Sequence, residues 1–139
     1  MSETENLIEI ATNARLCSLA PFSKFLVGAA LRTEAGKIFT GCNIESASYG
    51  LTVCAERVAI WKALSECERK FTDLVIVVDT DELTPPCGTC RQIIWEYSKD
   101  AKITLANLKG QSEVVDIRHL LPKAFDARFL TGGRDKSSE

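Results

Sequence analysis

The sequence is poor in histidine, in long apolar runs and in charge of one sign. Its 139 residues include one histidine, His119, and 17 Lys and Arg against 19 Asp and Glu. A single histidine excludes any site built on two imidazole groups, and the near balance of charge argues against a nucleic acid polymer as partner. No apolar run reaches the roughly 18–20 residues of a membrane span, and the acidic N-terminus is unlike a secretory signal. We therefore expect a cytoplasmic protein that does not bind membranes.

The length and composition indicate one globular domain. A chain of 139 residues that is 45% hydrophobic and 26% charged is large enough to bury a single core. We assign this domain to residues 1–130. Residues 131–139 are polar and offer nothing to pack, so we expect them to form a flexible tail.

The apolar pattern predicts a layered α/β fold. Ser2 and Glu5 have the spacing of a capping box, and apolar residues recur at helical spacing from Leu7 onward. The elements that we expect after this first helix are strands 25–33 and 37–43, a helix 53–67, a strand 74–78, a helix 88–97, strands 102–106 and 112–116, and a helix 117–121. This order predicts a mixed sheet of about five strands.

Three of the six cysteines lie where they can bind a metal. Cys54 stands in a Cys-Ala-Glu-Arg segment, and Cys87 and Cys90 stand in a Pro-Cys-Gly-Thr-Cys segment. Each group falls at a predicted loop-to-helix junction, where free N–H groups and the helix dipole favour a thiolate. Three thiolates without an obvious fourth ligand match a catalytic Zn²⁺ site, which keeps one position for water.

Charged residues stand beside the cysteines of both segments. Glu56 follows Cys54 by two residues, which suits a general base that faces a water without being a ligand. Arg57 and Arg91 are adjacent to the two groups, and we expect them to donate hydrogen bonds that offset the charge of the thiolates.

Other functions are compatible with these cysteines taken alone. A strand, a loop and a C-x-x-C segment that opens a helix also fit a thiol redox protein that uses Cys87 and Cys90. A structural zinc module that only binds partners is a further alternative, although it leaves Glu56 without a role. We interpret Cys17, Cys42 and Cys67 as small buried packing residues, because none has a partner at a ligand spacing.

The motifs together resemble those of the zinc-dependent nucleoside deaminases, and most closely the small cytidine deaminases. Their signature is a His or Cys followed by Glu, then Pro-Cys-x-x-Cys, and this chain carries the all-cysteine version. The likeness extends to segments 21–31, 41–47 and 120–125 and covers roughly residues 5 to 130. The resemblance implies a three-layer α/β/α fold.

The resemblance also implies a role for each residue that matches a family motif. Cys54, Cys87 and Cys90 would hold one Zn²⁺ per chain, and Glu56 would move protons. The other implied positions are Phe25, Asn43, Glu45, Tyr49, Ala55 and Phe125 around the substrate, and Arg57 beside the ligand thiolates. Phe125 would reach the site of a neighbouring subunit, because the small members of the family are homotetramers with shared active sites.

The implied reaction is hydrolytic deamination of cytidine and 2′-deoxycytidine to the uridines and ammonia, in pyrimidine salvage. A free nucleoside fits better than a nucleotide, because Glu45 would repel a phosphate. A blasticidin-S-type deaminase shares the zinc motif, but the Asn43-Ile44-Glu45 segment argues against it.

Two residues depart from the usual pattern of the family. Phe22 stands where the family has Tyr, and Pro85 replaces a polar residue while still offering its carbonyl group.

Overall fold

The structure, a computed structural model, describes residues 2–130. The tail expected at 131–139 lies outside this range. The chain forms helix α1 (Glu3–Ala14) with a 3-10 turn (Arg15–Cys17), strands β1 (Val27–Thr33) and β2 (Ile38–Cys42), a second 3-10 turn (Tyr49–Leu51), helix α2 (Ala55–Ser65), strand β3 (Phe71–Val78), helix α3 (Gly88–Ser98), strands β4 (Lys102–Asn107) and β5 (Ser112–Val115), and the short helices α4 (Ile117–Leu120) and α5 (Ala127–Leu130).

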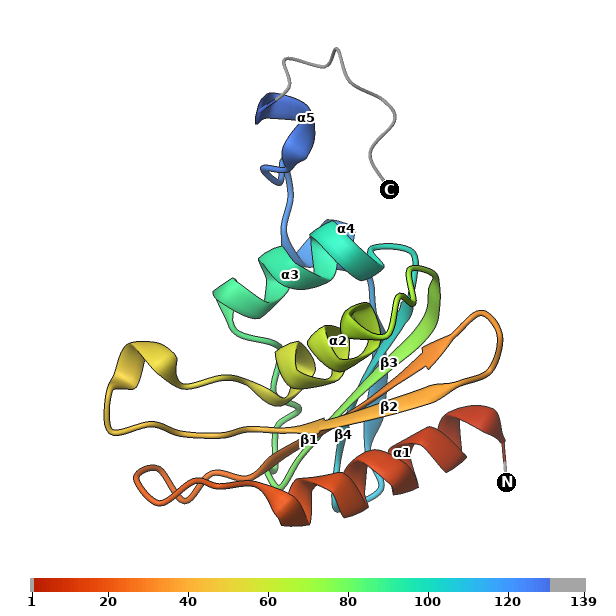
Figure 1. Ribbon diagram of the computed structural model, residues 1–139. Coiled ribbons are helices and arrows are strands. Elements are labelled where there is room, and N and C mark those ends of the chain that lie inside the picture. The colour runs from red at the N-terminus through yellow and green to blue at the C-terminus, as the bar shows by residue number, and fades with distance from the viewer. Residues whose placement is uncertain (1, 131–139) are drawn as a thin grey trace.

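The five strands form one mixed sheet in the order β2-β1-β3-β4-β5 (Figure 1). Strands β3 and β4 run parallel, with helix α3 as their crossover, and the other neighbouring pairs are antiparallel. The continuous apolar run of β3 is explained by its place at the centre of the sheet, where both of its faces are covered. The prediction of a mixed α/β sheet of about five strands is confirmed.

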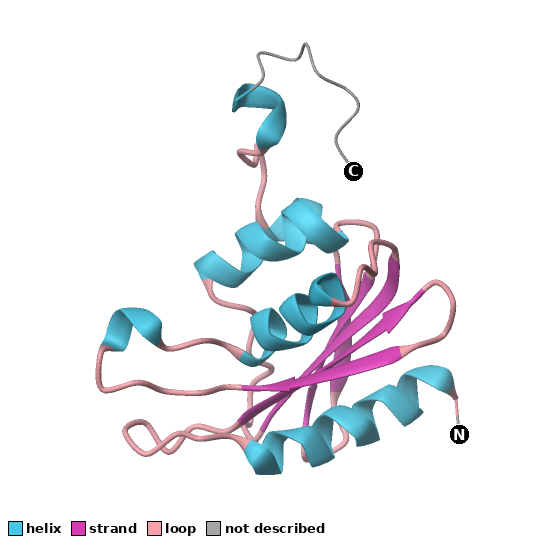
Figure 2. Ribbon diagram, viewed as in Figure 1, coloured by secondary structure: helices cyan, strands magenta, loops and turns pink. Residues whose placement is uncertain are grey.

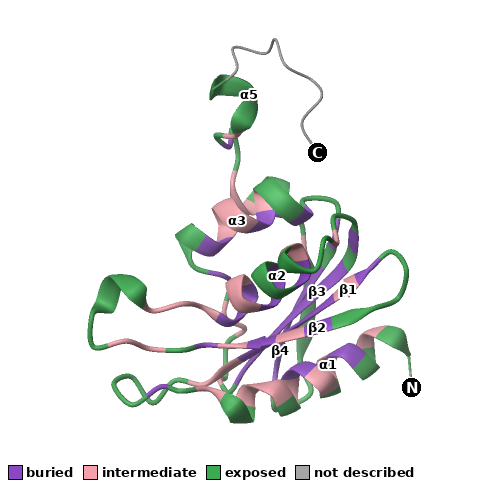
Figure 3. Ribbon diagram, viewed as in Figure 1, coloured by how far each residue is buried: buried purple, intermediate pink, exposed green. Residues whose placement is uncertain are grey.

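Helices cover both faces of the sheet, which gives three layers (Figure 2). Alternate residues of β1 point to opposite sides: Ala29 and Leu31 join the larger core beneath α2 and α3, whereas Ala30 packs with Leu7 and Ala11 of α1. Burial is concentrated on the central strands and on the helix faces that meet them (Figure 3). The helices that carry the cysteine motifs therefore share one layer.

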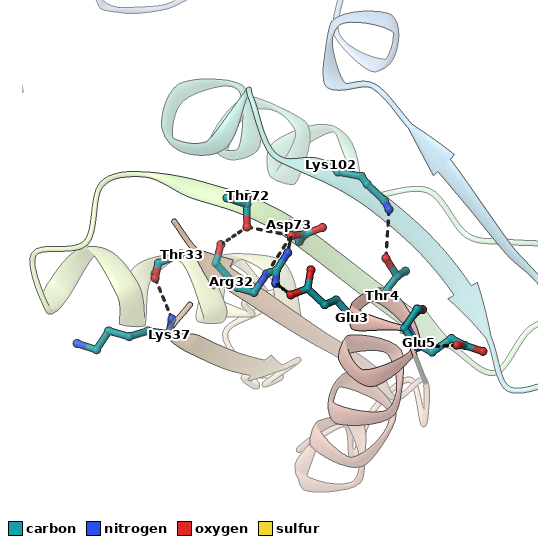
Figure 4. Close-up of polar contacts among 10 residues, drawn as sticks. Glu3, Thr4, Glu5, Arg32, Thr33, Lys37, Thr72, Asp73 and Lys102 are labelled. Atoms are coloured by element: carbon teal, nitrogen blue, oxygen red, sulfur yellow. Dashed lines mark hydrogen bonds and ion pairs between the residues drawn. The ribbon is translucent and has the colours of Figure 1, made fainter. Parts of the chain in front are cut away.

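The start of α1 is tied to the sheet by polar contacts (Figure 4). The Arg32 guanidinium on β1 binds the carboxylate of Glu3 at 2.9 Å, and its Nε donates to Asp73 on β3 at 3.1 Å. Lys102 of β4 donates to Thr4 Oγ1 at 3.1 Å. These contacts hold α1 across three strands, on the opposite side of the sheet from the cysteine motifs.

Gly41 lets helix α2 approach the sheet closely. A Cβ atom on Gly41 would lie 2.2 Å from the carbonyl oxygen of Ala55 and 2.7 Å from the backbone nitrogen of Ala59. Both atoms are backbone, so they cannot turn away as a flexible side chain could. The absence of a side chain at this position therefore sets the height of α2 above β2.

The expected capping box at Ser2 and Glu5 is present, and the main helices and strands occur where the pattern placed them. Helix α5 was not predicted, because four residues carry no readable period. The interpretation of Cys17 and Cys67 as buried packing residues was wrong. Both are exposed, because Cys17 falls in a 3-10 turn and Cys67 lies beyond the end of α2. Cys42, on β2, is half-buried.

Replacing Gly41 with alanine should destabilise the protein by about 1–3 kcal/mol, the usual cost of overpacking a core. The cause is the clash of the new Cβ atom with the backbone of α2. The free energy of unfolding, measured by denaturant titration, checks this expectation. Gly50→Ala is the matched control, because no atom of residues 2–130 outside its chain neighbours lies within 4 Å of the added atom there. Equal stability of the two variants would contradict the close approach.

Candidate active site

Two helix N-termini bring the three motif cysteines together. Cys54 is the N-cap residue of α2, and Cys87 is the N-cap residue of α3. Neither cysteine side chain makes a capping hydrogen bond to its helix. Cys90 follows in the first turn of α3. The free backbone N–H groups of both helices therefore surround the sulfur atoms with positive potential.

The spacing of the sulfur atoms suits one metal ion. The Sγ atoms of Cys54 and Cys87 are 3.7 Å apart, those of Cys87 and Cys90 are 3.4 Å apart, and all three lie within 4.8 Å of one another. Thiolates are preferred ligands of Zn²⁺, which binds sulfur at about 2.3 Å in tetrahedral geometry. The donor set therefore fits zinc, and the fourth position is left for a water.

The electrostatics of the cluster favour thiolate formation at Cys54. Hydrogen bonds from Cys90, Arg57 and Cys87 lower the pKa of the Cys54 thiol to about 5, against the opposing effect of burial. The pKa of Cys90 is raised, first because its thiol hydrogen-bonds Cys54 and then because it is buried. Ionisation of Cys54 thus disfavours ionisation of Cys90, and a cation bound by both sulfur atoms would stabilise both as thiolates.

The two neighbouring arginines have different partners. An Nη of Arg57 donates to the Cys54 sulfur at 3.8 Å and to the Thr52 carbonyl at 3.2 Å. Arg91 instead donates to the carbonyl groups of Pro86 and Leu120, at 2.9 and 3.0 Å. The expectation that both arginines reach a thiolate was therefore wrong for Arg91, whose hydrogen bonds brace the loop before Cys87.

Glu56 is a buried carboxylate beside the sulfur cluster. Its side chain belongs to the first turn of α2, and the residue is only 4% exposed. Burial raises the pKa of Glu56 to about 7, since desolvation disfavours the charged form and the nearby Cys54 adds like charge. A carboxyl group whose pKa lies near neutrality can both accept and donate a proton.

Asn43 and Glu45 follow strand β2 and hold the segment before β1. The Asn43 amide donates to the Phe25 carbonyl at 2.7 Å and accepts from the backbone of Val27 at 2.9 Å. Glu45 accepts from the backbone N–H groups of Phe22 and Ser23, at 2.9 and 3.1 Å, and from the Ser23 hydroxyl. These contacts, led by the Ser23 hydroxyl, lower the pKa of Glu45 and keep it ionised.

The aromatic residues singled out in the sequence are all substantially exposed in one chain. The rings of Phe22 and Tyr49 meet edge to face with centroids 5.9 Å apart, and Phe25 lies in the same segment as Phe22. Phe125 stacks on Phe129 at 5.8 Å, on the segment that leads to α5 and stands off from the body of the fold (Figure 1). Phe22, Phe25 and Phe125 are therefore not part of the hydrophobic core.

Sequence reasoning missed three residues around the site. Ser23 orients Glu45, Thr52 anchors Arg57 through its carbonyl group, and Trp61 places its ring 5.7 Å from the Arg57 guanidinium carbon. Only the Trp61 contact could have been predicted from the sequence, since Trp61 is four positions from Arg57 and residues four apart on a helix are neighbours. The other two depend on loop conformations that no periodicity encodes.

Comparison with known proteins agrees with this geometry. A family model described as the cytidine and deoxycytidylate deaminase zinc-binding region matches residues 1–106. The chain therefore belongs to this family of zinc-binding deaminases.

The relatives are similar along almost the whole chain. A cytidine deaminase from Halalkalibacterium halodurans is 45% identical over 129 residues, which cover 92% of this chain and 98% of that protein. The crystal structure of a cytidine deaminase from Burkholderia pseudomallei matches with a TM-score of 0.86 at 44% identity, covering 90% of this chain and 100% of that one. A blasticidin-S deaminase from Bacillus cereus is 35% identical over 124 residues, 84% of this chain and 87% of that protein. The three-layer α/β/α fold is thereby confirmed.

The purified protein should contain about one zinc ion per chain, as three converging thiolates predict. Cys90→Ser should lose most of this zinc, because a hydroxyl group is a poor substitute for a thiolate at neutral pH. Metal analysis of the purified proteins measures both. Cys17→Ser is the matched control, as Cys17 is exposed and outside the cluster. Metal-free protein with a reversible Cys87–Cys90 disulfide would favour the thiol redox alternative instead.

Proposed function

We propose that this chain catalyses the hydrolytic deamination of cytidine and 2′-deoxycytidine, as an enzyme of pyrimidine salvage. The products are uridine or 2′-deoxyuridine and ammonia. The observation that carries the proposal is the buried carboxylate of Glu56 beside three sulfur atoms that fit zinc. A structural zinc module has no use for such a carboxylate, whereas hydrolysis requires a group that moves protons. The relatives named cytidine deaminase support the choice of substrate.

Glu56 performs the proton transfers of the proposed reaction. Cys54, Cys87 and Cys90 would hold the zinc ion, which would supply the Lewis acidity that lowers the pKa of a water towards neutrality. Glu56 accepts a proton from the attacking water and delivers it to N3 of the cytosine ring as the new C4–O bond forms. Glu56 then takes the remaining proton from the new C4 hydroxyl group and passes it to the amino group, so that the C4 carbonyl forms, the C4–N bond breaks and ammonia leaves. Burial supports this role, because it separates the carboxylate from bulk water, so that its proton exchanges take place within the site.

The residues around β1 and β2 bind the nucleoside in this proposal. An ionised carboxylate offers about four acceptor positions, and the three hydrogen bonds to Glu45 leave one for a ribose hydroxyl. Asn43 uses one donor and one acceptor on the neighbouring backbone and keeps a second N–H for the ribose. Phe25 packs beside the base, Tyr49 contributes at the rim, and the backbone of Ala55 hydrogen-bonds the base edge.

The proposal also includes the assembly and location of the enzyme. Residues 1–130 form one catalytic domain, and four chains form a homotetramer with shared active sites. Phe125 reaches the base in a neighbouring site, and its exposure in a single chain supports this assignment. The reaction takes place in the cytoplasm. Among residues 2–130 no helix is long and apolar enough to cross a membrane.

Glu56→Gln should lower the turnover of cytidine by roughly 10²–10⁴-fold, the usual contribution of a positioned acid–base group. The amide keeps the shape of the side chain and cannot move a proton between water and N3. The change in ultraviolet absorbance as cytidine becomes uridine measures the rate. Metal analysis of the same preparation is the control, because zinc should be retained. Substantial activity of this variant would refute the assigned role of Glu56.

Cytidine should be deaminated in preference to its 5′-monophosphate. The ionised Glu45 lies where the ribose is bound, and a phosphate placed near it experiences like-charge repulsion. Parallel assays with cytidine, 2′-deoxycytidine, CMP and blasticidin S at equal concentrations measure the preference. Faster turnover of CMP would contradict a nucleoside site, and faster turnover of blasticidin S would transfer the activity to the related class of deaminase.

A further inference from the structure

Trp61 covers the arginine that contacts the metal-binding sulfur. Both residues lie on α2, four positions apart, and the Arg57 guanidinium carbon is 5.7 Å from the centroid of the Trp61 ring. Trp61 is 47% exposed, so part of this large ring faces outward while part covers the arginine. Residues four apart on a helix are neighbours, and a guanidinium group over an indole is attracted by the electrons of the ring.

The polar contacts of Arg57 with residues 2–130 leave one edge of its partly buried guanidinium without a partner. One Nη atom donates to the Thr52 carbonyl at 3.2 Å and, over a longer distance, to the Cys54 sulfur at 3.8 Å, and the guanidinium also interacts with the Cys90 thiol. The Nε atom is buried and has no hydrogen-bond partner in the part of the chain that the structure describes. No described residue therefore holds the Nε edge of the guanidinium by a hydrogen bond, and the orientation of the group depends also on what packs against its plane.

We propose that Trp61 is a positioning residue for the zinc site, which holds the guanidinium of Arg57 against the sulfur of Cys54. The proposal rests on the zinc binding described above and adds a residue to it. A positive group kept beside the sulfur stabilises the ligand as thiolate, so the ring of Trp61 strengthens zinc retention through Arg57. Trp61 itself touches neither metal nor substrate in this proposal.

The experiment compares zinc dissociation constants, measured by competition with a chromogenic chelator. Trp61→Ala should bind zinc about three- to tenfold more weakly, less than the roughly 10–100-fold loss expected when Arg57 itself is replaced by alanine. Trp61→Phe should restore most of the affinity because it keeps an aromatic face. Trp61→Leu should not restore the affinity, since it keeps an apolar side chain without a ring. This variant replaces Trp61→Ala in the comparison if the alanine variant does not fold.

A double substitution separates positioning from a general effect on the fold. Trp61→Ala should cause no additional loss of zinc affinity in a chain that already carries Arg57→Ala, because the arginine is the group through which the ring acts. Tyr97→Ala on α3 is the matched control, as an aromatic residue of similar exposure, 43%, and it should leave zinc affinity unchanged. Circular dichroism and melting temperatures of the metal-free proteins confirm that each variant folds.

The outcomes distinguish this inference from the proposed function. Zinc affinity of Trp61→Ala equal to that of the unchanged protein would overturn the inference alone. A loss that persists in full when Arg57 is already absent would also overturn it, since Trp61 would then act through the packing of α2. If the unchanged protein binds no zinc at all, both the inference and the proposed function are wrong.

Discussion

The mutual repulsion of three thiolates is the constraint around which this site is organised. Sulfur atoms within 4.8 Å of one another cannot all be ionised unless positive charge is supplied from several directions. Two helix N-termini and the Arg57 guanidinium provide part of it, and a divalent cation bound by the three sulfur atoms would provide the rest. The sheet contributes indirectly, because it fixes α2 and α3 in one layer with their first turns adjacent. A buried glutamate can then work beside the cluster without being a ligand.

The position of α2 depends on Gly41, a residue without a side chain that could take part in a reaction. Gly41 lets the backbone of the helix rest almost on β2, and this close packing determines where Cys54 and Glu56 lie. On the other face, α1 is held by Arg32 and its two carboxylate partners, away from the site. The fold therefore separates these groups by layer, with the cysteine cluster and Glu56 on one face of the sheet and the tethered helix α1 on the other.

Sequence reasoning succeeded where chemistry depends on short-range spacing. The capping box at Ser2, the cysteine segments at helix starts and the buried central strand all follow from local patterns. It failed for contacts that depend on which way a side chain points or on the conformation of a loop. Arg57 and Arg91 look equivalent in sequence, yet only one points to a sulfur atom. The contacts of Glu45 require a loop in which Lys24 adopts a positive φ of 62°, which composition does not predict.

Arg91 joins two segments that are far apart in the chain. Its guanidinium grips the carbonyl oxygen of Pro86, immediately before a cysteine of the cluster, and that of Leu120, at the end of α4. The segment beyond Leu120 leads to Phe125, whose carbonyl oxygen is held by Gln92 of the same helix α3. Helix α3 thus carries two of the three clustered cysteines and also holds the segment that leads to α5. Through Arg91, the end of α4 and the loop before Cys87 are fastened to the same side chain, so the two ends of this region share one anchor.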